Sequence, residues 1–192
     1  MCIKSSFRGS GGRIFHRIDF DFIGSNQNCE IITSESSSDY LNYYTTGTSV
    51  EGVTFVRLYK SITYKNIYPN IDLIFMMNDK EGFKYNFIVH PCGNLSSIRL
   101  KINGPEIILT ESGSLQLTTT IGSIEEVIPQ SWLLGNEPRV NFKTKFRLIN
   151  DSLYGFHARL KRPVNSTLVI DPVPKMNGVK PEHMTPEAIF SS

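Results

Sequence analysis

Alanine is nearly absent from this sequence, since only two of the 192 residues are alanine. Because alanine is the best helix former and one of the commonest residues of soluble domains, its scarcity excludes a helix bundle, a coiled coil and a helical repeat. The large hydrophobic residues are instead β-branched or aromatic, with 21 isoleucines, 12 phenylalanines and 8 tyrosines. Such residues suit the pleated surface of a sheet. The composition therefore predicts an all-β protein with little or no helix.

Long apolar runs and an excess of one charge are also missing. No stretch approaches the ~18 apolar residues of a membrane-spanning helix, and the net charge is only +2, with acidic and basic residues interspersed. Without a basic block to contact phosphates, we expect no nucleic-acid partner. The first twelve residues lack the hydrophobic core of a signal peptide. This indicates either a cytoplasmic protein or a chain whose true N-terminus is missing.

Cysteine is scarce as well, with Cys2, Cys29 and Cys92 as the three thiols. None belongs to a C-x-x-C pair or has a histidine at ligand spacing, so we expect neither a metal site nor a cofactor. An odd number excludes a complete disulfide framework, although a bridge between Cys29 and Cys92 stays open. The sequence also has no P-loop, no dinucleotide-binding glycine motif and no G-x-S-x-G nucleophile elbow. No catalytic residue is therefore assigned by motif.

Apolar and polar side chains alternate with a period of two along much of the chain, which is typical of half-buried strands. The alternation is clear over residues 14–22 and 53–64. Residues 71–77 and 83–89 flank an Asn-Asp-Lys-Glu-Gly loop, and this arrangement predicts a β-hairpin. About a dozen short strands at such spacing predict an antiparallel β-sandwich. The other strands are expected at 29–33, 97–102, 106–110, 114–119, 139–149, 154–160 and 168–170.

The strand pattern runs from residue 13 to residue 172. It predicts one β-sandwich module, 13–172, or two subdomains at 13–66 and 67–172. The preceding residues 1–12 are rich in glycine and serine, so we expect a flexible start. Residues 173–192 are Pro-rich and contain few strand formers, which predicts a disordered tail.

Aromatic side chains supply one set of candidate ligand-binding residues. Tyr40, Tyr43 and Tyr44 follow the polar segment 34–39, which we interpret as a loop. These three rings, together with Trp132, could stack on a sugar ring in a carbohydrate-binding β-sandwich. The alternative is that the rings fill a gap between the sheets. The two hypotheses differ in whether the rings are exposed or buried.

Carboxylates support a less favoured hypothesis, a glycan hydrolase, which needs two acidic groups ~5–10 Å apart. The candidate pairs are Asp19 with Asp21, on one face of a predicted strand, and Glu125 with Glu126. Together with Asn26, the first pair could also bind Ca²⁺ through oxygen ligands. Any solvated strand face would present the same pattern, so neither pair establishes a site.

Several ordered motifs resemble one known family. They are Y-x-N-I-Y-P-x-I-D-L at residues 64–73, G-F-K-Y-N-F-I-V-H-P at 82–91, I-x-L-x-x-x-G at 98–104, a Gly/Thr/Glu/Pro pattern at 113–129 and L-V-I-D-P at 168–172. Together they resemble the uncharacterised all-β N-terminal domain that precedes SBBP-type β-propeller repeats in large secreted or cell-surface bacterial proteins. The acidic residue of the first motif is Asp72, whose carboxylate we expect to be exposed or to cap a turn, because its two neighbours are apolar.

The resemblance implies a non-catalytic structural or interaction module that acts in adhesion, as a scaffold or in presenting the following repeats. It implies an extracellular or cell-surface location and adjacent β-propeller repeats as partners, with a surface glycan or protein as a further partner. Here a Pro-rich tail follows residue 172 where the family has repeats, which implies a fragment or a truncated relative. The resemblance carries over no active site.

Overall fold

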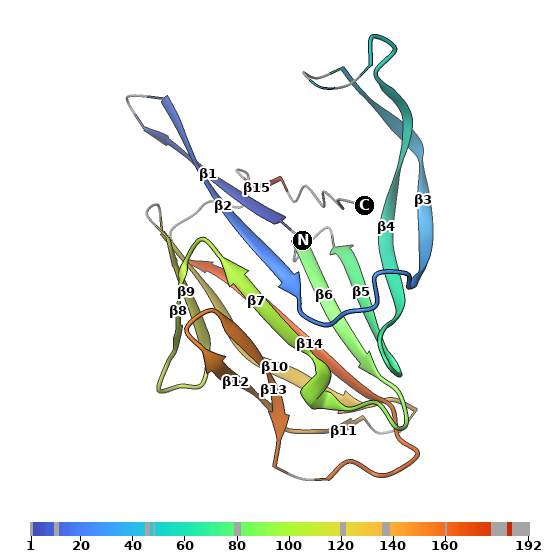
Figure 1. The fold of residues 1–192 in the computed structure, drawn as a ribbon, viewed down its shortest axis with the longest axis vertical. Helices are drawn as coiled ribbons and strands as arrows, with labels where there is room; N and C mark the ends of the chain where they lie inside the picture. The colour runs from blue at the N-terminus through green and yellow to red at the C-terminus, as the bar shows by residue number, and fades with distance from the viewer. Residues whose placement is uncertain are drawn as a thin grey trace.

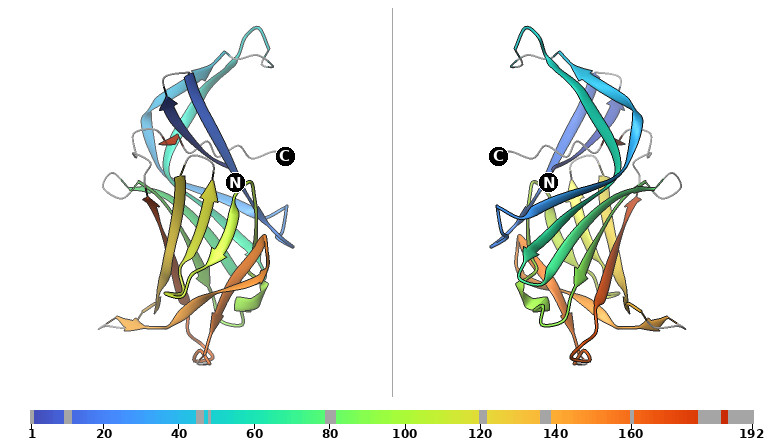
Figure 2. Two further views of the ribbon diagram at one scale, coloured as in Figure 1. Left: turned by 90° about the vertical axis from the view of Figure 1, so that its left-hand side faces the viewer. Right: turned by 90° about the vertical axis from the view of Figure 1, so that its right-hand side faces the viewer.

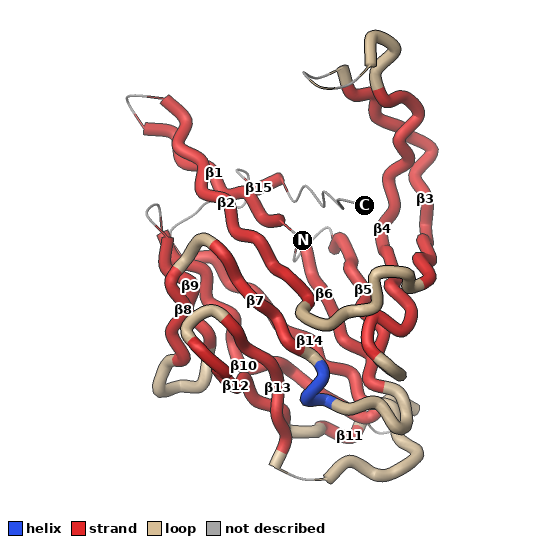
Figure 3. The backbone as a smooth tube through the Cα atoms, viewed as in Figure 1, coloured by secondary structure: helices blue, strands red, loops and turns tan. Residues whose placement is uncertain are grey.

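The computed structural model shows an all-β protein in which two antiparallel sheets pack face to face (Figure 1). This confirms the predicted fold class, a β-sandwich. Fifteen strands and one short 3₁₀ helix, η1 (Leu95–Ser97), are present among the described residues (Figure 3). The structure describes residues 2–9, 12–44, 47, 49–78, 82–119, 122–135, 139–159, 161–177 and 184–185, with only the backbone for 2–9, 12–17, 35, 77–78, 82–83, 173–177 and 184–185.

The smaller sheet has six strands, and every pairing within it is antiparallel. Its strands come from both ends of the chain as well as from its middle. In spatial order they are β12 (Thr144–Asn150), β13 (Leu153–Ala158), β7 (Arg99–Asn103), β2 (Gly12–Phe22), β1 (Cys2–Gly9) and β15 (Met184–Thr185).

The larger sheet has nine strands. One of them, β11 (Val140–Asn141), pairs with the end of β10 and lies outside the main order. The other eight are, in spatial order, β3 (Glu30–Tyr43), β4 (Val53–Tyr68), β5 (Ile71–Asn78), β6 (Gly82–Val89), β14 (Leu168–Asn177), β10 (Gly122–Leu133), β9 (Leu115–Thr119) and β8 (Glu106–Leu109).

The hydrophobic core lies between the two sheets. In β7 the apolar residues Leu100 and Ile102 are buried while Lys101 between them is exposed, as a period of two requires. The rings of Phe87 from β6 and Phe156 from β13 meet edge to face, with centroids 5.7 Å apart, and so join the two sheets. The alternation of the sequence therefore becomes one inward-facing apolar layer on each sheet.

The hairpin of β3 and β4 extends beyond the rest of its sheet, as Figures 1 and 2 show. Among the described residues, the pairing of β4 with β5 begins at Ser61, and before it β4 pairs with β3. We call β3, residues 53–60 and the described residues between them the β3–β4 arm. Most side chains of the arm are exposed, whereas the end of β4, at Tyr64, Ile67 and Tyr68, is buried in the core.

The hairpin predicted at residues 71–89 is confirmed, since β5 and β6 pair without interruption from Ile71–Val89 to Asn78–Gly82. The 12-residue strand β10, in contrast, was not expected. Its sequence contains Pro129, which normally argues against a central strand because proline has no N–H to donate. The structure accommodates this proline at a β-bulge between Val127 and Gln130, where the register with β14 shifts.

Several boundaries differ from the expectation. The polar segment 34–39, expected to be a loop, belongs to β3, because Ser34 and Ser36 pair with β4 whatever their side chains are, and the register shifts before Tyr40. The expected flexible start contains β1, and β14 continues past residue 172 to Asn177. Residues 178–183 and 186–192 of the expected disordered tail lie outside the described residues. Strands from both sides of residue 66 share each sheet, as β2 pairs with β7 and β4 pairs with β5.

Candidate functional site

The β3–β4 arm carries most of the exposed large hydrophobic side chains. Of the eighteen such residues among the described side chains, eleven lie in the arm. A two-stranded ribbon with solvent on both faces is only marginally stable in water, and a contiguous exposed apolar surface usually marks an interaction site. The eleven are Ile31, Ile32, Tyr40, Leu41, Tyr43, Tyr44, Val50, Val53, Phe55, Leu58 and Tyr59.

The local geometry of the arm positions an aromatic pair. The rings of Tyr40 and Phe55 lie with their centroids 5.0 Å apart. Phe55 has a φ of 59°, a region that side chains other than glycine seldom adopt. Its N–H donates to the side-chain Oδ1 of Asn42 at 2.9 Å, which holds this unusual conformation in place. Strained backbone of this kind is often found at functional positions.

The structure brings together three of the four aromatic residues proposed to bind a ligand. Tyr40, Tyr43 and Tyr44 lie on the arm and are 48%, 44% and 67% exposed, so they do not fill a gap between the sheets. Trp132 lies elsewhere, in β10, and is half-buried. The guanidinium of Arg139 is 3.4 Å from the centre of its ring. One face of the indole is therefore occupied by a cation–π contact instead of being open to a sugar.

Asp72 is buried, with 3% of its surface exposed, so the first of the two expected alternatives, an exposed carboxylate, is wrong, whereas its bond to the backbone N–H of Asn66 fits the second, a turn cap. Its Oδ1 accepts the backbone N–H of Asn66 at 2.8 Å, and its Oδ2 accepts Nε2 of His90 at 2.8 Å and Nζ of Lys65. Burial alone would raise the pKa of this carboxyl, but the bonds from His90, Lys65 and Asn66 outweigh it and lower the pKa.

The burial of Asp72 follows from the path of the chain around it. Asn66 and Asn70 both adopt positive φ, 51° and 57°, and so bend the end of β4 around the start of β5. The carbonyl of Asn70 also accepts the backbone N–H of His90 at 2.9 Å. Asp72 therefore ties three segments together, the ends of β4 and β6 and the start of β5. Alternation in sequence places a side chain on a face but does not show which segment covers that face.

A second buried carboxyl, Glu126 in β10, lies in the core between the sheets. Its Oε1 accepts the hydroxyl of Tyr85 from β6 at 2.9 Å, and its Oε2 accepts the hydroxyl of Tyr154 from β13 at 3.3 Å. Burial raises the pKa of Glu126 to about 7, although the two tyrosine bonds lower it. The candidate partner, Glu125, is the adjacent strand residue and points to the opposite face. The two carboxyls therefore do not form a pair.

Two of the remaining candidates, Asp21 and Asn26, are bonded to neighbouring residues. The Oδ2 of Asp21 accepts the side-chain amide of Asn103 at 2.9 Å, and Asn26 uses its Oδ1 for the N–H of Asn28 at 3.0 Å within its own turn. Among the described residues, no three His, Cys, Asp or Glu side chains are placed to hold a metal ion. Cys29 is half-buried, Cys92 is exposed, and both thiols are free.

The architecture defines the class of this protein as a β-sandwich domain with an exposed hairpin arm. The chain belongs to the family described as a domain of unknown function, DUF7948, whose family model matches residues 4–173. The match includes all of the motifs identified in the sequence, at residues 64–172. No curated protein and no solved structure matches the chain. Within the described part of the chain, no helix is long and apolar enough to span a membrane.

Proposed function

We propose that this domain is a non-catalytic structural and interaction module, and that the β3–β4 arm is its contact surface. The observation that supports this best is the concentration of eleven exposed large hydrophobic side chains in the β3–β4 arm, nine of them outside the stretch where β4 also pairs with β5. Burying such side chains against a partner removes apolar area from water, at roughly 25 cal/mol per Å². A partner that covers the arm would therefore bind through this hydrophobic contribution, which the isolated chain does not gain.

The two buried carboxyls support a structural role. Both oxygens of Glu126 accept bonds from tyrosines on strands of both sheets. Both oxygens of Asp72 accept bonds from the segments that it ties together. A carboxyl that is enclosed and bonded by the fold in this way joins the segments around it and is not open to a substrate.

We further propose that the module belongs to a secreted or cell-surface bacterial protein and precedes β-propeller repeats, acting in adhesion, as a scaffold or in presenting the repeats. The motifs at residues 64–73, 82–91 and 168–172 support this setting. Reading the gene on both sides of this frame tests it directly. We expect an upstream signal peptide and downstream repeats. A closed gene whose product works with a cytosolic partner would contradict the proposal.

Hydrogen–deuterium exchange tests the role of the arm. It is measured on two proteins: this chain alone, and a longer protein in which the chain is joined to the segments that its gene encodes on either side. We expect slower exchange in the arm of the longer protein, and we expect the double substitution Tyr44→Ser with Phe55→Ser to weaken that protection. Val164→Ser is the matched control, because Val164 is 80% exposed but lies in the β13–β14 connection, outside the arm. Equal exchange of the arm in both proteins would refute its role as the contact surface.

A carbohydrate-binding role is the second candidate, and the aromatic cluster of the arm favours it. Tyr43 and Tyr44 are exposed on the same arm as the contacting rings of Tyr40 and Phe55, and exposed aromatic faces suit sugar rings. A glycan array probed with the chain tests this role. Binding that Tyr44→Ala abolishes would support it, and an array without any signal would remove it.

A further inference from the structure

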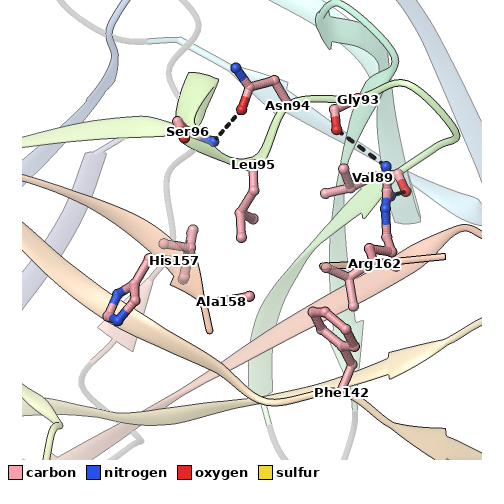
Figure 4. A pocket seen from close by; sticks show the side chains of 11 residues that line it. Val89, Gly93, Asn94, Leu95, Ser96, Phe142, His157, Ala158 and Arg162 are labelled. Carbon is pink, nitrogen blue, oxygen red and sulfur yellow. Dashed lines mark hydrogen bonds between the residues drawn. The ribbon is translucent and has the colours of Figure 1, made fainter. Parts of the chain in front are cut away.

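A cavity of about 270 Å³ opens between the two sheets, near the ends of β6 and β13 (Figure 4). Figure 4 shows Leu95 of η1, Phe142 and Ala158 of β13 directed toward a common space. The inner wall is formed by the buried side chains of Val89, Phe156 and Leu168. The lining is therefore mixed, with these apolar side chains from both sheets beside the polar residues Asn94, Ser96, His157 and Arg162.

One cation, Arg162, lies at the edge of this cavity. Its Nη1 donates to the carbonyl of Val89, and its Nη2 donates to the carbonyls of His90 at 2.9 Å and Gly93 at 3.2 Å. These three bonds use three of the five N–H groups of a guanidinium, so two donors remain. Among the described residues, no carboxylate contacts Arg162. A partly buried cation without a counter-charge is costly to the fold.

A second polar residue, His157, lies at the edge of the same cavity. The Nδ1 atom of His157 is buried and has no hydrogen-bond partner among the described residues. Buried polar atoms in folded proteins are almost always bonded, so each exception calls for an explanation. Figure 4 shows the ring of His157 directed away from the space shared by Leu95, Phe142 and Ala158, so Arg162 is the charged group placed to orient a ligand there.

We propose that this cavity binds a small amphipathic carboxylate, with its apolar body between Leu95, Phe142 and Ala158 and its carboxylate on Arg162. Ligand sites are typically apolar pockets with a few polar groups that orient the ligand. An apolar cavity of 150 Å³ holds benzene, so this larger one fits a body of about six to ten carbon atoms. A single guanidinium with two free N–H groups matches one carboxylate better than a doubly charged phosphate.

Titration of the whole chain with octanoate, followed by NMR, tests this site, and octanamide is the matched neutral ligand. We expect octanoate to shift the signals of residues around the cavity and to bind at least about tenfold more tightly than octanamide, because its bond to Arg162 is charge-assisted. Arg162→Gln is expected to remove this preference. Failure of octanoate to bind the unmodified chain, or equal binding of the amide, would overturn the proposal.

Arg162→Gln could also loosen the carbonyls that Arg162 holds, so a second variant is needed. Ala158→Leu fills the cavity without touching the guanidinium, and we expect it to abolish octanoate binding while the chain stays folded. Val164→Leu, in the same connection as Arg162 but outside the cavity lining, should bind octanoate like the unmodified chain. Octanoate binding that survives Ala158→Leu would place the ligand elsewhere and refute the site.

Discussion

The buried carboxyl of Glu126 makes the stability of the sandwich depend on pH. Its pKa rises from an ordinary value of 4.5 to about 7 in the folded protein, chiefly because burial disfavours the charged form. Below pH 4.5 the group is protonated in the folded and unfolded states alike, so the fold bears no cost. Between about pH 4.5 and 7 the unfolded chain releases the proton while the folded chain keeps it. The free energy of unfolding therefore falls as pH rises through this window.

The magnitude follows from the size of the pKa shift. Each unit of difference between the folded and unfolded pKa corresponds to 1.36 kcal/mol, so a carboxyl at about 7 costs the fold about 3 kcal/mol above pH 7. Tyr85 and Tyr154 do not titrate in this window, because burial raises their pKa values well above 10. Asp72 affects stability at lower pH, because its pKa is lowered in the folded protein. The free energy of unfolding that it contributes is lost as pH falls below about 4.

The test is Glu126→Gln, which removes the charge and keeps the shape and one carbonyl acceptor. We expect the variant to match the unmodified chain near pH 4.5 and to be about 3 kcal/mol more stable at pH 8. Glu125→Gln is the control, because Glu125 neighbours it in β10 on the opposite face and should leave the pH dependence of unfolding intact. Urea unfolding, followed by tryptophan fluorescence at several pH values, gives both numbers. A stability difference between Glu126→Gln and the unmodified chain that does not change with pH would refute the reasoning.

Three further substitutions test other parts of the structure. Asp72→Asn removes the anion that accepts the bonds of Lys65 and His90 and should destabilise the fold by about 2 kcal/mol in thermal unfolding; an unchanged Tm would contradict the account of this cluster. Gly155→Ala places a Cβ 2.5 Å from the backbone oxygen of Ile98, so we expect a loss of about 2 kcal/mol in urea unfolding, and a neutral result would show that β7 and β13 can move apart. Arg139→Ala should cost about 0.5–1 kcal/mol and change the fluorescence of Trp132, whereas an unchanged spectrum would argue against the cation–π contact.

Local patterns predicted the elements whose partners lie close in sequence. The hairpin at residues 71–89 was predictable because its two strands pair across a short loop, and the register depends only on that loop. Strand β10 was not predictable from the sequence, because Pro129 and the adjacent Glu125 and Glu126 interrupt its alternation of apolar and polar residues. The bulge that accommodates the proline exists only where β14 lies beside β10.

Of the candidate sites, one was visible in the sequence and the other was not. The aromatic cluster at residues 40–44 was visible in the sequence as a candidate, but its exposure depends on how far the arm extends beyond β5. The cavity beside Arg162 left no local signal, because its walls come from β6, η1, β13, β14 and the segment after β11. Such a site arises from the packing of two sheets, which no single stretch of sequence describes.

The sequence by itself determined that this protein is built from strands, because β-branched and aromatic residues alternating with polar ones can bury one face only in a sheet. Only the tertiary structure decided which polar groups are buried and with whom. Glu126 meets Tyr85, 41 residues away, and Tyr154, 28 residues away, because β6, β10 and β13 converge in the core. Alternation assigns a side chain to a face of its strand, whereas the neighbour that it meets there depends on how the strands are ordered and packed.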